Sequence, residues 1–88
     1  MPLPDYYAIL QVPASATFTE IKRSYRHLVR LYHPDLNTQA KDGRIKQLNE
    51  AYSVLRDATK RATYDALLLE ERRAAAIAEM IRQHQEAV

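Results

Sequence analysis

Cysteine is absent from this chain of 88 residues, and glycine occurs once. Without cysteine the chain cannot form disulfides, thiol nucleophiles or zinc sites with cysteine ligands. It also lacks an apolar run near the ~20 residues that a membrane-spanning helix needs, and its start lacks the pattern of a signal peptide. A chain of this length is enough for one small domain, whose core is of marginal size. The missing thiols fit a reducing cytoplasm.

Alanine, leucine, arginine and glutamate are abundant instead. All four favour helices, so the composition predicts an all-α domain. The formal net charge of +2 is mild. The total charge therefore indicates little about partners, whereas the distribution of the charges is informative.

Capping patterns mark the starts of two helices. Asp5 can cap a short helix over residues 6–10. Thr17 and Glu20 form a capping box, in which the Thr17 side chain bonds the Glu20 backbone N–H and the Glu20 side chain reaches back. The helix that opens here is expected to run to about Tyr32. Its apolar residues recur at helical spacing and form one stripe: Ile21, Tyr25, Leu28 and Tyr32.

The segment from His33 to about Lys41 lacks periodicity and contains a proline, which indicates a loop. A second long helix is expected over residues 42–56. Two amphipathic helices joined by a loop this short pack antiparallel most simply. After a break at residues 57–59, helical sequence continues from Lys60 to the end of the chain.

The short first helix is expected to close the core of the antiparallel pair. The expected core residues are Tyr7, Leu10, Ile21, Leu28, Ile45, Leu48, Tyr52 and Leu55. Tyrosines also recur at helical spacing, and we expect them to be core or half-core residues whose hydroxyls meet water. They are Tyr7, Tyr25, Tyr32, Tyr52 and Tyr64.

Two residues of the expected loop, His33 and Asp35, could form a catalytic pair. No nucleophile stands in a supporting context, however, and so short a chain leaves little room for a concave pocket. A metal site that adds His27 to this pair is as weakly supported, because the histidine spacing matches no recognisable ligand set. The simplest alternative is that Pro34 ends the helix and His33 caps its last carbonyls. An exposed loop on a rigid scaffold can equally carry recognition.

The helix expected before this loop is basic. Residues 18–32 carry four cations against Glu20 alone, a local formal charge of +3. This face could be a solvated surface, a contact for an acidic protein, or a contact for nucleic acid. Nucleic acid is the least favoured, because acids bracket the helix and no tight helix-turn-helix turn is present. The cations are Lys22, Arg23, Arg26 and Arg30, and the acids are Glu20, Asp35 and Asp42.

Five motifs, in this order and spacing, resemble the J-domain, the module that defines DnaJ-type co-chaperones. They are DYYAIL at 5–10, EIKRSYR at 20–26, HPD at 33–35, NEAYSVLRD at 49–57 and KRATYD at 60–65. The resemblance covers about residues 4–66. It implies an all-α fold with a short first helix, an antiparallel pair with an exposed His-Pro-Asp loop at its tip, and a fourth helix, here extended at the C-terminus.

The resemblance also implies a function. J-domains bind the ATP-bound form of the heat-shock protein 70 chaperone (DnaK in bacteria) and stimulate its ATP hydrolysis, after which the chaperone clamps its substrate. The catalytic residues would stay in that partner. The chain is therefore expected not to be an enzyme, to need no metal or other cofactor, and to act in the cytoplasm without membrane or nucleic acid.

The same resemblance assigns roles to single residues. Asp35 would engage an arginine at the partner's interdomain junction through a charge-assisted contact. Pro34 would fix the path of the loop, and His33 would orient Asp35 or contact the partner directly. Asn37 would add a polar contact after the loop. The docking residues on the basic helix would be Lys22, Arg23, Tyr25, Arg26, His27 and Arg30.

The end of the chain departs from the family. Many members carry a Gly/Phe-rich segment, zinc-binding cysteine repeats and a β-rich client-binding region after the J-domain, so client handling is not expected of this chain. We expect a J-domain at residues 1–66 and a charged, alanine-rich helical extension at 67–88. The extension could be solvated or could associate with a second copy. A J-like scaffold acting through residues 66–88 is the alternative function, although a pure scaffold has no physical need for the His-Pro-Asp tripeptide.

Overall fold

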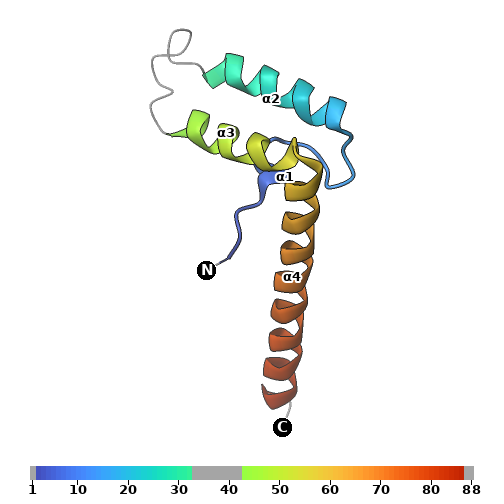
Figure 1. The fold of residues 1–88 in the computed structure, drawn as a ribbon. Coiled ribbons are helices and arrows are strands. Elements are labelled where there is room, and N and C mark those ends of the chain that lie inside the picture. Colours follow the sequence, from blue (N-terminus) through green and yellow to red (C-terminus); the bar gives the residue numbers. More distant parts are fainter. Residues whose placement is uncertain (1, 33–42, 87–88) are drawn as a thin grey trace.

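The computed structural model describes residues 2–32 and 43–86, and over these residues it contains four helices and no strand. The helices are α1 (Tyr6–Ile9), α2 (Phe18–Tyr32), α3 (Arg44–Leu55) and α4 (Ala58–Glu86). The helices α2 and α3 lie side by side and antiparallel, α1 packs against α3, and α4 leaves the end of α3 as a long helix (Figure 1). The expected all-α fold is confirmed.

Local hydrogen bonds explain where the first two helices begin. The Asp5 Oδ1 atom accepts the Ala8 backbone N–H at 3.0 Å and so caps α1. At the start of α2, the Glu20 backbone N–H donates to Thr17 Oγ1 at 3.2 Å, and the Thr17 N–H donates to Glu20 Oε1 at 3.3 Å. Both bonds of the expected capping box are therefore present, and they satisfy N–H groups that the helix leaves unpaired.

The break between α3 and α4 is shorter than the expected residues 57–59. Asp57 Oδ1 accepts the backbone N–H groups of Thr59 at 2.9 Å and Lys60 at 3.0 Å, so α4 begins at Ala58. These bonds, the one from Lys60 first, hold the pKa of the Asp57 carboxyl below its ordinary value. One aspartate therefore caps α4 directly after the chain leaves α3, and no longer loop is needed.

The core forms where α1, α2, α3 and the first turns of α4 meet. Most of the expected core residues are buried, whereas Ile45 and Tyr52 are half-buried at its edge. Tyr64, one of the tyrosines expected in or beside the core, is also buried. Three residues that the sequence did not predict for the core are buried as well, because small alanines fit close helix contacts and α4 adds Leu68. The buried residues are Tyr7, Leu10, Ala16, Ile21, Leu28, Leu48, Ala51, Leu55, Tyr64 and Leu68.

An arginine on α4 ties the chain before α2 to the rest of the fold. The Arg61 guanidinium donates to the backbone carbonyl of Ala14 at 3.1 Å and to that of Ala16 at 2.7 Å. Its Nε also donates to the Tyr7 hydroxyl at 3.1 Å, and that hydroxyl donates to Asp65 at 2.5 Å. Burial, followed by the bond to Asp65, raises the pKa of the Tyr7 hydroxyl. The network fixes the start of α2 relative to α1 and α4.

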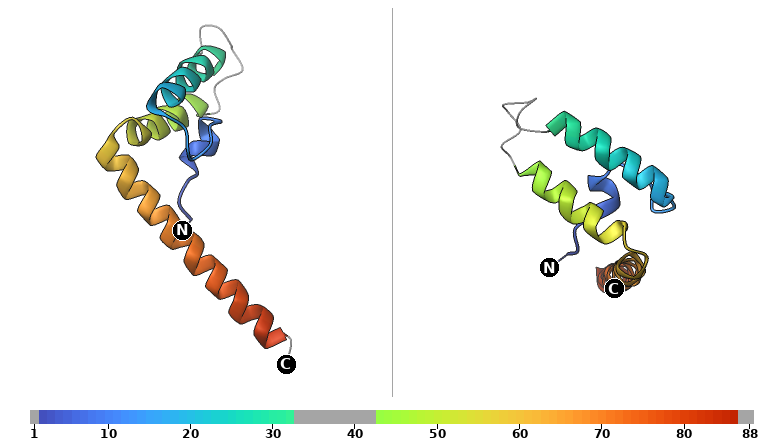
Figure 2. Two further views of the ribbon diagram at one scale, coloured as in Figure 1. Left: turned by 90° about the vertical axis from the view of Figure 1, so that its right-hand side faces the viewer. Right: turned by 45° about the horizontal axis from the view of Figure 1, so that its top comes forward.

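The N-terminal lead runs along the first part of α4. The Tyr64 hydroxyl donates to the Pro4 carbonyl at 2.7 Å, and the Leu3 backbone N–H donates to Glu71 Oε2 at 2.7 Å. Past Arg72, the described residues of α4 are exposed, and the helix projects away from the other three (Figure 2). The packed part of the molecule includes Leu68 of α4, which is buried in the core.

Candidate functional site

The cationic side chains of α2 lie on the side of that helix that faces away from the core. Burial of Ile21 and Leu28 fixes the rotation of α2 about its axis, so residues off this stripe point to solvent. Arg23, Arg26 and Arg30 are exposed, and Lys22 is half-buried. The structure therefore brings the expected docking cations onto one face. These cations line a shallow depression of about 480 Å³, whose residues are Thr19, Lys22, Arg23, Arg26, His27 and Arg30.

The electrostatics of this depression have one sign. None of the residues that line it is acidic. Glu20 is the one acid of α2, and its carboxylate accepts from Thr17 in the capping box at the helix start. A cluster of like charges on a rigid helix attracts a partner of opposite charge and orients its approach. The depression therefore suits an acidic protein surface.

Tyr25 directly precedes Arg26 in the chain, but it does not line the depression; it is half-buried and packs against α3. Its ring stacks on the ring of Tyr52 with centroids 4.0 Å apart, and its hydroxyl donates to Asn49 Oδ1 at 2.6 Å. The sequence predicted Tyr25 both for the apolar stripe of this helix and for the docking face, and it predicted Tyr52 for the core. It placed Asn49 in a motif of the second long helix but predicted no contact for its side chain. The available signal was the spacing of Asn49 and Tyr52, which are neighbours on one face of a helix.

The expected signalling residues His33, Pro34 and Asp35, and also Asn37, lie outside the described residues. What the structure describes is the pair of helix ends on either side of them. The Arg44 guanidinium of α3 lies over the Tyr32 ring of α2, 4.7 Å from its centroid. A cation–π contact of this kind links the last residue of α2 to the first residue of α3.

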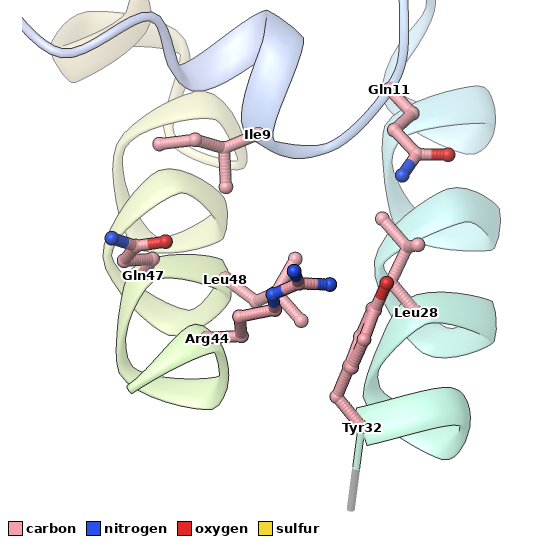
Figure 3. Close-up of a pocket in the computed structure, with 7 residues that line it drawn as sticks. All are labelled: Ile9, Gln11, Leu28, Tyr32, Arg44, Gln47 and Leu48. Carbon is pink, nitrogen blue, oxygen red and sulfur yellow. The ribbon is translucent and has the colours of Figure 1, made fainter. Parts of the chain in front are cut away.

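A small cavity lies behind this contact, between α2 and α3 and below the end of α1 (Figure 3). Its volume of about 190 Å³ is smaller than the about 300–1,000 Å³ of typical small-molecule sites. Its lining brings together no pair of acid and base side chains that could transfer a proton. The lining residues are Ile9, Gln11, Leu28, Tyr32, Arg44, Gln47 and Leu48.

Metal and membrane sites find no support in the part of the chain that the structure describes. Among residues 2–32 and 43–86, no three histidine, aspartate or glutamate side chains converge so that they could hold a metal ion. Of the metal set considered from sequence, His27 lies on the basic face, while its two partners fall outside the described ranges. No described helix is long and apolar enough to span a membrane.

Comparison with known proteins accounts for most of the chain. The family model of the DnaJ domain matches residues 5–65. The "Chaperone protein DnaJ" of Dictyoglomus thermophilum is 58% identical over 62 residues, which cover 69% of this chain and 16% of that protein. The "Chaperone protein DnaJ 2" of Thermus thermophilus is 55% identical over 62 residues, which cover 69% of this chain and 22% of that protein.

A relative with a different name shares the same region. The "Curved DNA-binding protein" of Coxiella burnetii is 52% identical over 64 residues, which cover 72% of this chain and 20% of that protein. The chain thus matches between 16% and 22% of the length of these relatives. The similarity is to one region of them and does not extend to their remaining length.

Proposed function

Because the chain belongs to the DnaJ domain family, we propose that it is a co-chaperone module that binds the ATP-bound form of a heat-shock protein 70 chaperone of the DnaK type and stimulates its ATP hydrolysis. One observation carries the proposal: the His33-Pro34-Asp35 tripeptide directly follows the helix whose exposed face is lined by cations. By this hypothesis one helix supplies the docking surface, and the residues after its end supply the signal.

Docking would use the basic face of α2. The core holds this helix rigidly through Ile21 and Leu28, so the cations need no large rearrangement to meet an acidic surface. Charges of this kind raise the association rate and set the register more than they raise affinity. A small polar interface also keeps the complex transient, which suits a regulator. The proposed docking residues are Lys22, Arg23, Tyr25, Arg26, His27 and Arg30.

Signalling would use the tripeptide and Asn37. In this proposal Asp35 pairs with an arginine of the partner, Pro34 restricts the backbone and His33 orients Asp35 or contacts the partner. The chain would act by preferring one conformation of the chaperone, and the difference between its affinities for the two conformations limits the shift. All groups that act on ATP would belong to the partner, so we propose a non-enzymatic role in protein folding, in the cytoplasm, without a cofactor.

The first experiment measures single-turnover ATP hydrolysis by a bacterial DnaK with the parent chain and with Asp35→Asn. Asparagine has nearly the same shape but no charge, so we expect stimulation by the parent and its loss in the variant. Circular dichroism must show that the variant keeps the helical content of the parent. A parent that fails to stimulate several DnaK proteins would refute the proposed function.

A second experiment separates docking from signalling with a matched pair of charge reversals. Arg26→Glu alters the basic face, whereas Arg73→Glu makes the same change on the exposed part of α4. We expect Arg26→Glu to raise the half-saturating concentration by about threefold to tenfold without changing the maximal rate, as loss of an interfacial charge contact would. Arg73→Glu should match the parent. Equal effects of both variants would mean that net charge, rather than the α2 face, is recognised.

The alternative function is a scaffold that acts through the helical extension. The observation that favours it is the exposed length of α4 beyond Arg72, which leaves that segment accessible to a partner or to a second copy. It would gain support if the parent failed to stimulate DnaK but sedimented as a dimer that a truncation after Ala74 dissolved. Binding to DNA with a steep salt dependence would point instead to nucleic acid.

A further inference from the structure

Three side chains form a layered contact between the docking helix and α3. The Tyr25 and Tyr52 rings are nearly parallel, with an interplanar angle of 8° and centroids 4.0 Å apart. The Arg56 guanidinium lies over the Tyr52 ring as well, 5.5 Å from its centroid. Tyr25 is on α2, Tyr52 is on α3, and Arg56 caps the C-terminal end of α3, so this contact joins α2 to the far end of α3.

A hydrogen bond fixes the outer end of the same tyrosine. The Tyr25 hydroxyl donates to Asn49 Oδ1 at 2.6 Å, and the bond lies at the exposed surface. Tyr52 restrains the plane of the Tyr25 ring, and Asn49 restrains its hydroxyl. The two contacts therefore favour one orientation of the Tyr25 side chain in the chain without a partner.

The bond between Tyr25 and Asn49 is exposed to solvent, which limits its contribution to folding. An exposed hydrogen bond exchanges with water and contributes little net free energy to folding. The same modest free energy is available to binding, because a side chain that is already ordered does not lose that freedom when the complex forms. Tyrosine is also among the residues that most often dominate the energetics of protein interfaces.

We propose that Asn49 and Tyr52 are positioning residues that hold Tyr25 in its binding orientation on the docking face. The proposal rests on the proposed function, since it names groups that support the same contact with the chaperone. Asn49 acts through the hydroxyl of Tyr25 and Tyr52 acts through its ring. Neither residue needs to touch the partner for its removal to weaken docking.

A double-mutant cycle tests the part played by Asn49. Asn49→Ala removes the acceptor, Tyr25→Phe removes the hydroxyl, and the third variant combines them. We expect Asn49→Ala to raise the half-saturating concentration for stimulation of DnaK by about threefold to tenfold, the penalty for ordering one side chain on binding. The maximal rate should stay unchanged. In the Tyr25→Phe background, Asn49→Ala should have no further effect, because the hydroxyl that it holds is gone.

Two further variants separate positioning from general packing. Tyr52→Leu keeps an apolar side chain but removes the stacked ring, and it should also raise the half-saturating concentration. Gln47→Ala removes an exposed amide from the same helix without touching Tyr25, so it should match the parent. Ring proton shifts of Tyr25 in the free chain should move in Asn49→Ala and Tyr52→Leu and stay constant in Gln47→Ala.

Each outcome has one meaning. If the parent stimulates DnaK and Asn49→Ala docks as well as the parent, the positioning role is wrong and the proposed function stands. The same conclusion follows if Asn49→Ala weakens docking as much in the Tyr25→Phe background as it does in the parent. If the Tyr25 ring shifts of Asn49→Ala equal those of the parent, the positioning role is also wrong. If the parent does not stimulate any DnaK, the proposed function fails and the positioning role fails with it, and all variants are then equally inactive.

Discussion

At the scale of single residues, Gln11 stands in a backbone conformation that its side chain disfavours. Its φ of 56° lies in the left-handed region, directly after Leu10, the C-cap of α1, and here the Val12 backbone N–H donates to the Tyr7 carbonyl at 3.0 Å. This geometry ends the helix and turns the chain toward α2. Glycine has no Cβ and adopts the same conformation without steric penalty.

Gln11→Gly is therefore expected to stabilise the fold. Relief of the left-handed penalty outweighs the greater freedom of glycine in the unfolded chain, for a net gain of about 0.5–1 kcal/mol in the free energy of unfolding. Urea denaturation followed by circular dichroism measures the difference. Gln11→Ala keeps a Cβ and should leave the stability close to that of the parent, so equal gains in both variants would contradict the explanation.

Tyr7 supplies the hydroxyl that joins Arg61 and Asp65. In Tyr7→Phe, Arg61 Nε loses its acceptor in a half-buried place, and we expect the free energy of unfolding to fall by about 1–2 kcal/mol. Tyr6→Phe is the matched control, because Tyr6 contacts Tyr64 through its backbone N–H and its ring. A loss in Tyr6→Phe as large as in Tyr7→Phe would show that the hydroxyl network contributes nothing specific.

At the scale of helices, the start of α4 depends on the ionised form of Asp57. Hydrogen bonds from the Lys60 and Thr59 N–H groups lower the pKa of this carboxyl below its ordinary value of 3.8. The ionised carboxylate therefore stabilises the fold at pH values above that ordinary pKa. That stabilisation is lost as the pH falls from about 4 through the lower pKa of the folded state. Protonation in acid therefore weakens the cap.

Asp57→Asn isolates this effect. Asparagine keeps the acceptor oxygen but does not titrate. We therefore expect the melting temperature to fall less in the variant than in the parent on acidification from about pH 6 to pH 2.5. Asp57→Ala removes the acceptor and should melt lower than Asp57→Asn at both values. Parallel acid melting curves for the parent and Asp57→Asn would rule out a contribution from this carboxyl.

Helix positions followed from sequence to within a few residues because their causes are local. The caps at Asp5 and Thr17 join atoms three residues apart, and the apolar stripe of α2 repeats every three or four residues. The break before α4 was placed too far along the chain, because Asp57 alone suffices as a cap. Gln11 was not singled out, since nothing in its residue type indicates a left-handed conformation.

At the scale of the whole molecule, α4 consists of a packed part and a projecting part. Leu68 is buried, Glu71 accepts the Leu3 N–H, and Arg72 lies 4.0 Å from the Asp5 carboxylate. From residue 73 to the end of the described helix, all residues are exposed. The projecting part is therefore expected to contribute little to the stability of the rest.

Two truncations test this division. A chain ending at Ala74 should melt within a few degrees of the parent. A chain ending at Ala66 loses Leu68 and the Glu71 contact, and we expect it to lose about 2–4 kcal/mol of unfolding free energy. Thermal melts of both chains at equal concentration provide the comparison. A large loss on truncation at Ala74 would mean that the projecting part packs against something, for which a second copy is the first candidate.

Sequence alone was enough for the helices, for the cationic face of α2 and for the family, because capping, periodicity and short motifs depend on residues that are near one another in the chain. The three-dimensional fold decided the rest. Only packing places Tyr25 on Tyr52, brings Tyr7 to Asp65 across a separation of 58 residues, and leaves Ile45 half-buried at the edge of the core. These contacts depend on the angles at which the helices cross. Small buried residues such as Ala51 permit close crossings, but their sequence pattern does not predict the angles.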